Sequence, residues 1–390
     1  MSIFSPIEAD RATQPPPTAN WMGFDQFMAH ALYDPDNGYY TASHSQIGLE
    51  ATLNNPSDFA TSPVISPHFG ATLAVQVADC LAATGTDEVW EFGAGTGALA
   101  VQLLGCLGDK IRRYNIVDLS ANLQARQRAT IEAALQATPV LTSKVHWLQA
   151  LPDALSGVIV GNEVLDAMPV KLLARINGDW FERGVVQGAV IGAVPGAVTS
   201  AASGDFHYAD VPTALRPPFE IAGSHDYVTE IHPQSEAFIQ TLADKLLHSQ
   251  RQTGKGGSIL MIDYGFGESE YYHPERSMGT VMCHKAHVSD TNPLVDVGRK
   301  DITAHVNFTA IALAAQDAGL AVNGYTSQGR FLLNCGLLDR LHGAALAEKA
   351  MAQKLVTEHE MGELFKVICL STQPDFEPLG FAVGDRSHTL

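Results

Sequence analysis

The sequence predicts an α/β fold of the doubly wound, Rossmann-like kind, in which parallel strands alternate with helices. A short apolar strand at 88–92 runs through a glycine-rich turn into a helix from 97 to about 107. A second strand at 114–118 ends in an acidic residue, about twenty positions after the last glycine of the turn. A third strand at 158–160 is apolar throughout, which is typical of parallel strands covered on both faces.

The glycine-rich turn is the strongest functional signal. Gly93, Gly95 and Gly97 alternate along it, and Glu91 precedes them on the strand. Glycine accepts a positive φ and lets a ligand approach the backbone closely, and a helix N-terminus beyond such a turn is the usual place for a nucleotide. The spacing differs from the Gly-x-Gly-x-x-Gly of dinucleotide-binding folds. It resembles the first motif of class I S-adenosylmethionine (SAM) methyltransferases. The alternative is a turn without a ligand, which rarely needs three such glycines.

The end of the second strand predicts a ribose contact. Asp118 has the spacing at which a carboxylate accepts hydrogen bonds from both ribose hydroxyls. The alternative is that Asp118 caps the next helix, a role that Ser120 could fill instead. We assign Leu119 beside it and Gln149, in the turn after a candidate strand at 145–148, to the same cofactor site, with Gln149 next to the adenine.

Polar residues after the strand at 158–160 predict where the chemistry takes place. Ligands of open α/β sheets bind at the carboxyl ends of the strands, so Asn162, Glu163 and Asp166 should lie near the reacting group. Two carboxylates and an amide can hold a cationic amine or guanidinium and help to remove its proton. Asn162 alone could instead cap a following helix. Asp263, at the tip of an apolar strand from 258, is a third candidate catalytic carboxylate.

Composition limits the partners. Against 24 Lys and Arg stand 42 Asp and Glu, which gives a net charge of −18. This balance argues against nucleic acid or an anionic membrane as the main partner and is compatible with a basic protein substrate. A simpler alternative is that acidic surfaces favour solubility. No apolar run reaches membrane-spanning length, so we expect no membrane insertion.

The cysteines predict neither a disulfide framework nor a metal site. They are scattered without a Cys-x-x-Cys pair, which is typical of reduced thiols in a reducing compartment. No His, Cys and Asp cluster has the spacing of metal ligands. The first residues lack a signal peptide and are poor in arginine, so we expect a bacterial cytoplasmic protein rather than a mitochondrial one.

We expect four segments in the chain of 390 residues. They are a leader with a helical cap (1–84), the first part of the cofactor-binding core (85–170), an insertion with a β hairpin and a helix (171–257), and the second part of the core with C-terminal helices (258–390). Ser62-Pro63 and Ser66-Pro67 predict extended turns before a helix at 69–83. The other expected elements are helices at 24–33, 121–137, 235–250 and 307–319, a hairpin turning at Asn177-Gly178, and strands at 227–232, 320–325 and 365–370.

Several separated blocks resemble one known family, that of MidA, also called the complex I assembly factor 7 family of SAM-dependent methyltransferases. The blocks are 24–33, Gly38-Tyr39-Tyr40, 61–70, 91–97, 162–170, 262–265, 301–306, 328–332 and 361–366. The mitochondrial members symmetrically dimethylate an arginine of a complex I core subunit. The resemblance implies that Gly93, Gly95 and Gly97 hold SAM, that Asp118 contacts the ribose, and that Asn162 and Glu163 lie near the reacting group. One departure is an insert between Ile47-Gly48 and Asp58-Phe59, which puts the identity of the substrate in doubt.

Our leading hypothesis is therefore methyl transfer from SAM to a nitrogen of a partner protein, with arginine as the acceptor. One alternative is a non-catalytic SAM-binding assembly factor. Another is an NAD-dependent oxidoreductase, which the glycine spacing opposes. The sequence leaves the oligomeric state open, with a homodimer as one option, and does not identify the substrate protein.

Overall fold

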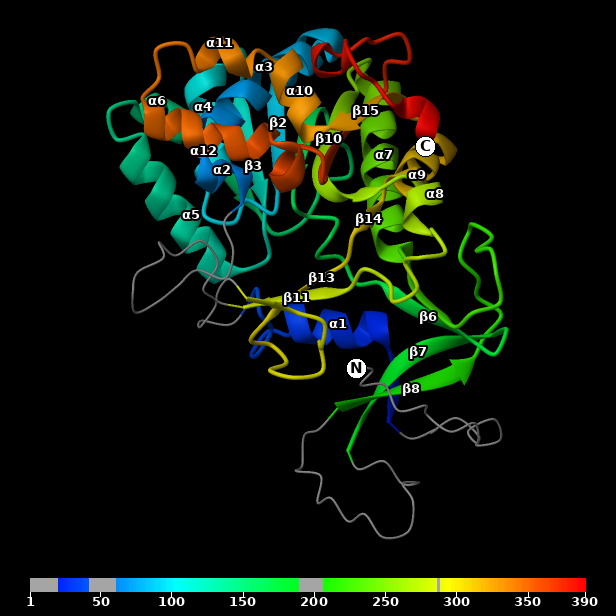
Figure 1. Ribbon diagram of the computed structural model, residues 1–390. Helices are drawn as coiled ribbons and strands as arrows, with labels where there is room; N and C mark the ends of the chain where they lie inside the picture. The colour runs from blue at the N-terminus through cyan, green and yellow to red at the C-terminus, as the bar shows by residue number, and fades with distance from the viewer. Residues whose placement is uncertain (1–19, 42–60, 189–205, 286–287) are drawn as a thin grey trace.

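The computed structural model describes residues 20–41, 61–188, 206–285 and 288–390. In Figure 1 a central sheet with helices on both faces forms the upper part, and two smaller sheets with helix α1 lie below it. The α/β, doubly wound fold predicted from the sequence is confirmed.

The central sheet has eight strands, with β15-β16-β10-β5-β2-β3-β4 as its main order. From β4 to β10 neighbouring strands are parallel, whereas β16 is antiparallel to both of its neighbours. A short β14 adds to β10 in parallel. The bounds are β2 (Glu88–Phe92), β3 (Arg113–Val117), β4 (Val145–Leu148), β5 (Gly157–Asn162), β10 (Gly257–Phe266), β14 (Val306–Asn307), β15 (Ala321–Ser327) and β16 (Phe365–Ser371).

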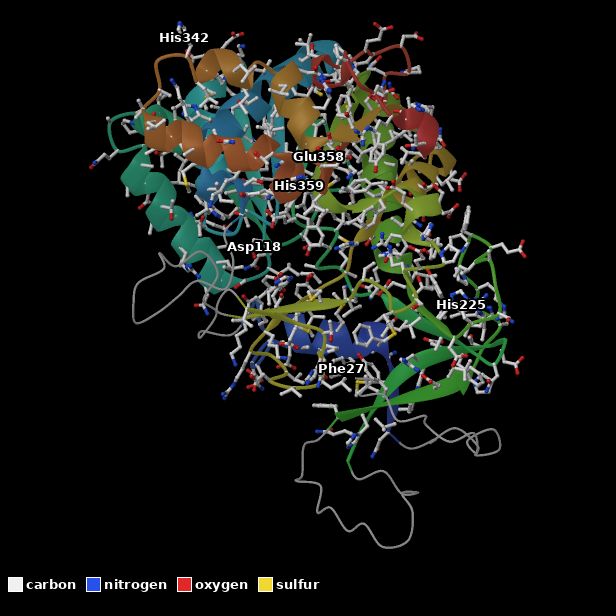
Figure 2. The ribbon with its side chains drawn as sticks, in the orientation of Figure 1. Phe27, Asp118, His225, His342, Glu358 and His359 are labelled. Carbon is white, nitrogen blue, oxygen red and sulfur yellow. The ribbon has the colours of Figure 1, made fainter. Side chains whose placement is uncertain are left out.

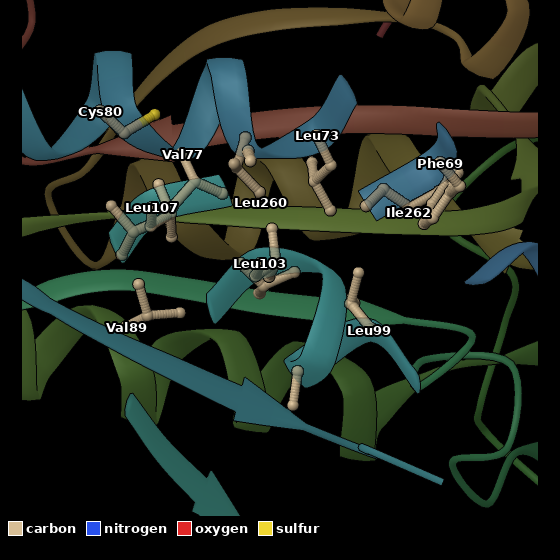
Figure 3. Close-up of a cluster of buried hydrophobic side chains, with 14 of the residues drawn as sticks. Phe69, Leu73, Val77, Cys80, Val89, Leu99, Leu103, Leu107, Leu260 and Ile262 are labelled. Carbon is tan, nitrogen blue, oxygen red and sulfur yellow. The ribbon is translucent and has the colours of Figure 1, made fainter. Parts of the chain in front are cut away.

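Alternating side chains of these strands build a core on each face of the sheet. Val158 and Val160 of β5 pack in one core, and Ile159 between them packs in the other. The first core is covered by α3 (Pro67–Thr84), α4 (Ala98–Leu107), α5 (Ala121–Ala134) and α10 (Gln328–Asn334). Figure 3 shows Leu73 and Val77 of α3 and Leu103 of α4 against Leu260 in this core. The second core is covered by α7 (Pro233–Thr253) and α9 (Phe308–Asp317).

The lower part is built mostly from the insertion and the N-terminal segment. Its five-stranded sheet has the order β1-β7-β6-β9, with β8 also paired to β7. Helix α1 packs its apolar side on this sheet and on the three-stranded sheet β12-β11-β13. The bounds are β1 (Trp21–Gly23), α1 (Phe24–Tyr33), β6 (Lys171–Ile176), β7 (Asp179–Gln187), β8 (Phe206–Pro212), β9 (Tyr227–Ile231), β11 (Met282–Lys285), β12 (Val288–Asp290) and β13 (Asp301–Thr303).

Short helical elements complete the described chain. They are α2 (Ser62–Ile65), α6 (Pro139–Thr142), α8 (Glu268–Tyr271), α11 (Leu337–Arg340), α12 (Leu346–Val356), η1 (Gly108–Lys110), η2 (Glu358–Gly362), η3 (Leu379–Phe381) and η4 (Ser387–Thr389).

Several local predictions are confirmed. The hairpin turns at Asn177 and Gly178, whose φ values of +51° and +92° suit a tight two-residue turn. Asn307 caps α9, since its side-chain oxygen accepts the Ala310 N–H at 3.2 Å.

Other local predictions are corrected. Residues 62–65 form the helical turn α2 rather than an extended turn, because Pro63 lies in the first turn, where the missing N–H costs nothing. Helix α5 ends at Ala134, not at 137. Helix α7, which we assigned to the insertion, packs on the central sheet through Ile239, Leu242 and Leu246. The leader at 1–19, the insert before Asp58-Phe59 and the segment 189–205 lie outside the described residues.

Candidate active site

The three glycines of the turn between β2 and α4 all have a positive φ, of +65° at Gly93, +51° at Gly95 and +86° at Gly97. Their surroundings differ. A Cβ at Gly93 would lie 2.8 Å from Cγ2 of Val164, and one at Gly97 would lie 3.3 Å from Cα of Gln127. Among the described residues, a Cβ at Gly95 would meet only the Gly93 carbonyl oxygen, at 4.0 Å. Gly93 and Gly97 therefore permit close packing of the protein, while Gly95 faces open space that a ligand can occupy.

A pocket opens at this turn, at the carboxyl ends of β2 and β5. Segment α2 forms one wall, the glycine turn forms another, and Glu91 and Asn162 come from the ends of the two strands. Its lining residues are Thr61, Pro63, Val64, Glu91, Gly93, Ala94, Gly95, Thr96, Ala98, Leu99 and Asn162. Of the predicted cofactor residues, Glu91, Gly93, Gly95 and Asn162 are thus brought together in one pocket.

Glu91 lies beneath the turn with 1% of its surface exposed. The Tyr114 hydroxyl donates a hydrogen bond of 2.7 Å to its carboxylate. Burial raises the pKa of Glu91 to about 7, and the bond from Tyr114 opposes this shift. A ligand that donates a hydrogen bond to Glu91 would therefore favour its ionised form.

Asp118 follows β3 and is held on both carboxylate oxygens. One accepts the Ser120 N–H at 2.8 Å, and the other accepts the Gln127 side-chain N–H at 2.7 Å. The Ser120 hydroxyl caps α5 by accepting the Leu123 N–H, so Asp118 is not the cap. Figure 2 shows Asp118 at the lower side of the central sheet, where the smaller sheets begin.

Four predicted cofactor residues do not line the pocket: Asp118, which follows β3, and Gly97, Leu119 and Gln149. Gly97 packs against α5 instead. Leu119 is 77% exposed, and Gln149 is also exposed, so both lie on the surface beside the strand ends.

The candidate catalytic residues lie in the turn after β5. Glu163 has φ +55°, a left-handed conformation that is strained for a residue other than glycine and is frequent at functional sites. The Asn162 side chain donates to the Glu163 carboxylate at 2.9 Å, and its own oxygen is buried with no hydrogen-bond partner in the described part of the chain. No helix follows Asn162, so the capping alternative is ruled out.

The two carboxylates of this turn hold their protons more tightly than isolated acids. Burial, and then the charges of Asp166 and Asp301, raise the pKa of Glu163 to about 8, while hydrogen bonds from Asn162 and the Ser62 N–H oppose the shift. Burial raises the pKa of Asp166 to about 6. Such shifted acids in one turn mark a candidate functional site.

Asp263 lies behind this turn and not on its open side. It is 1% exposed, and one of its oxygens accepts the N–H groups of Val164, Leu165 and Asp166 at 3.1, 2.9 and 3.3 Å. Burial and the neighbouring carboxylates of Asp166 and Glu163 raise its pKa well above the usual value. These bonds point to a role in shaping the turn, which differs from the catalytic role expected from the sequence.

Sequence reasoning missed the closure of the site by α2. The Gln102 side chain donates to the Pro63 carbonyl at 2.7 Å and accepts the Gly70 N–H at 2.8 Å, which ties α2 to α3 and α4. The Ser-Pro pairs signalled a rigid segment, but nothing in them revealed that it packs against the glycine turn. Sequence reasoning also missed Tyr40, which lies in the lower part of the molecule. Its hydroxyl donates a hydrogen bond of 2.7 Å to Asp301, one of the carboxylates that raise the pKa of Glu163.

Two further findings concern the described residues only. No cluster of three or more His, Cys, Asp or Glu side chains there could hold a metal ion. None of the helices described is both long and apolar enough to span a bilayer.

Comparisons with known proteins agree with this geometry. A family described as "Putative S-adenosyl-L-methionine-dependent methyltransferase" has a model that matches residues 72–326. The protein arginine methyltransferase NDUFAF7, mitochondrial, of Homo sapiens is 26% identical over 385 residues, covering 88% of this chain and 79% of that protein. Its homolog in Caenorhabditis elegans is 25% identical over 339 residues, covering 81% of this chain and 73% of that protein.

A solved structure is more similar still. The crystal structure of a "likely methyl transferase" from Burkholderia thailandensis bound to S-adenosyl-homocysteine has 44% sequence identity and a TM-score of 0.85. The match covers 95% of this chain and 93% of that one. The predicted cofactor, S-adenosyl-L-methionine, is thereby confirmed.

The residues of the pocket fit this cofactor. Gly95 leaves room for a ligand against the backbone, and the unpaired oxygen of Asn162 can accept a hydrogen bond from a ligand ammonium group. Gly93, Gly95, Glu91 and Asn162 would therefore hold S-adenosyl-L-methionine, with Asp118 at the end of the neighbouring strand.

Proposed function

Since this chain belongs to that S-adenosyl-L-methionine-dependent methyltransferase family, as its resemblance to MidA predicts, we propose that it methylates an arginine side chain of a partner protein. The distant relatives named as protein arginine methyltransferases support this choice of acceptor.

The observation that carries the proposal is the pair of acids after β5. Glu163 and Asp166 lie in one turn beside the cofactor pocket, and each has a raised pKa, of about 8 and about 6. Within the described residues, no lysine or arginine forms an ion pair with either carboxylate. A guanidinium group from outside would supply the missing positive charge and form paired hydrogen bonds with carboxylates.

We infer a role for each group from its position in or beside the pocket. The cofactor supplies an electrophilic methyl group when bound. Asn162 lines the pocket and bonds to Glu163, so it connects the cofactor position with the acceptor position. Once the positive charge of the guanidinium favours their ionised forms, Glu163 and Asp166 would orient the acceptor nitrogen and accept the proton that it loses on methylation. Asp263 would keep both in place through the backbone of the turn.

The charge of the chain favours a basic partner segment. With a net charge of −18, the protein attracts positively charged peptides over distances of a Debye length. An arginine in a basic, extended segment is therefore the substrate that we propose.

A non-catalytic assembly factor is the second candidate. It is favoured by the large lower part, which adds two small sheets and α1 next to the pocket and could hold a partner. The oxidoreductase alternative is set aside, because the solved relative binds S-adenosyl-homocysteine.

The proposal is tested with methyl-labelled S-adenosyl-L-methionine and two peptide pools that differ only in carrying arginine or lysine. Label in methylarginine of the first pool alone would support it. Label in lysine would contradict the choice of arginine as the acceptor. Binding of S-adenosyl-homocysteine without methyl transfer to either pool would favour the assembly factor.

A further inference from the structure

Gln127 on α5 has no exposed surface, and both the nitrogen and the oxygen of its side-chain amide form hydrogen bonds. Its nitrogen donates to the Asp118 carboxylate at 2.7 Å and to the Gly95 carbonyl at 3.3 Å. Its oxygen accepts the indole N–H of Trp147 on β4 at 3.0 Å. One amide thus joins the aspartate after β3 with the middle glycine of the turn.

Trp147 determines which way this amide points. An indole N–H can only donate, so the amide oxygen must face Trp147 and the amide nitrogen must face Asp118. The Arg128 guanidinium lies over the Trp147 ring, 3.7 Å from its centroid, and holds the ring in place. The orientation of Gln127 is therefore set by a residue on the next strand.

The amide in turn determines how Asp118 can act. With Gln127 on one oxygen and the Ser120 N–H on the other, the carboxylate is fixed in one plane as an acceptor. Each oxygen keeps a lone pair for a further donor. Two neighbouring hydroxyl groups of a ribose match such a pair of acceptors.

We propose that Gln127, oriented by Trp147, is a positioning residue that fixes Asp118 and the Gly95 carbonyl for recognition of the cofactor ribose. The amide links the aspartate after β3 to the glycine turn of the cofactor pocket. It acts through Asp118, so its effect should depend on the ribose hydroxyl groups of the ligand.

The experiment is calorimetric titration with S-adenosyl-homocysteine and with its 2′-deoxy analogue, for the wild-type chain, Gln127→Leu and Trp147→Phe. A lost hydrogen bond to a charged group should weaken binding of S-adenosyl-homocysteine about tenfold or more in Gln127→Leu. Binding of the 2′-deoxy analogue, which keeps only the 3′-hydroxyl for Asp118, should fall by a clearly smaller factor, so the preference for the 2′-hydroxyl shrinks. Trp147→Phe should reduce the same preference by a smaller factor.

Two reference variants make the result decisive. Asp118→Asn should largely remove the preference for the hydroxyl, since it replaces one of the two acceptor oxygens by an amide nitrogen and removes the negative charge. Trp21→Phe loses an indole bond to the Ala209 carbonyl of 2.9 Å in the lower sheet and should leave both affinities unchanged.

Equal weakening of both ligands in Gln127→Leu would mean a merely structural role and would overturn the proposal. The proposal would also fail if Asp118→Asn removed the preference and neither Gln127→Leu nor Trp147→Phe changed it. An unchanged preference in Asp118→Asn would show that another group recognises the ribose, which would also overturn the proposal. The Tm of each variant, measured alongside, identifies any variant that is unfolded. If Gln127→Leu is unfolded, the ligand preference of Trp147→Phe decides.

Discussion

The side-chain amide of Asn162 donates a hydrogen bond of 2.9 Å to the carboxylate of Glu163, its neighbour in sequence. Asn162 lines the cofactor pocket, whereas Glu163 sits in the adjoining turn in a left-handed conformation with φ +55°. A single bond between adjacent residues thus joins the cofactor pocket to the turn that we propose as the acceptor site.

The raised pKa of Glu163 predicts a pH-dependent cost in stability. Its pKa of about 8 exceeds the usual value of 4.5, so its stabilising contribution is fully present below pH 4.5 and is lost as pH rises through 8. Glu163→Gln removes this loss. The difference in Tm, Glu163→Gln minus wild type, should therefore increase by roughly a few degrees between pH 5 and pH 9. Calorimetric scans across this range measure it, and a difference that stays constant with pH would count against the shifted pKa.

Gly95 should be required for binding and not for folding. Gly95→Ala places a Cβ in the space left for the ligand, at a residue with φ +51°. Gly254→Ala is the matched control, because Gly254 has φ +76° and open space around it at the end of α7. Both should lose about 1 kcal/mol of stability through the strained backbone. Only Gly95→Ala should lose affinity for S-adenosyl-homocysteine, by about tenfold or more, and equal affinities of the two variants would contradict the assigned pocket.

Gln102 should slow the release of the cofactor. It ties α2 over the pocket through the Pro63 carbonyl, so Gln102→Leu should loosen that wall. We expect a dissociation rate of S-adenosyl-homocysteine raised by about three- to tenfold, with little change in the association rate. Stopped-flow fluorescence measures both rates. Gln250→Leu breaks a similar bond, of 3.1 Å to the Thr372 carbonyl, and serves as the control. The same change in both variants would rule out a specific role of α2.

Asp263 should matter more for the stability of the turn than for affinity. Asp263→Ala leaves four backbone N–H groups without their acceptor, those of Val164, Leu165, Asp166 and Tyr264, which should cost about 2–4 kcal/mol of unfolding free energy. Asp263→Asn keeps one oxygen and should cost less. Denaturant unfolding of both variants checks the order, and an Asp263→Ala variant as stable as the wild type would refute this role.

The parts of the fold that the sequence predicted are those fixed by local chemistry. Short continuous apolar runs located β2, β5 and β10, because each of these strands is covered on both faces. Asn177 and Gly178 identified their hairpin, because few residues accept the required φ values.

What remained hidden depends on contacts between distant segments. The place of α2 over the pocket rests on Gln102, and the place of α7 on the central sheet rests on packing that its sequence alone does not specify. In the candidate site, the acids after β5 were identified from their position at a strand end. The different role of Asp263 was not, because the acceptor of three backbone N–H groups cannot be distinguished in sequence from a carboxylate that faces a substrate.

The most direct test of the account is the single-turnover rate of methylarginine formation by wild type and Glu163→Gln, measured by mass spectrometry with the affinity for S-adenosyl-homocysteine determined in parallel. If Glu163 orients the guanidinium and takes its proton, the rate should fall about 100-fold or more while the affinity stays within about twofold. An unchanged rate, or a loss of cofactor affinity that accounts for the whole effect, would contradict the assignment of Glu163 to the acceptor site.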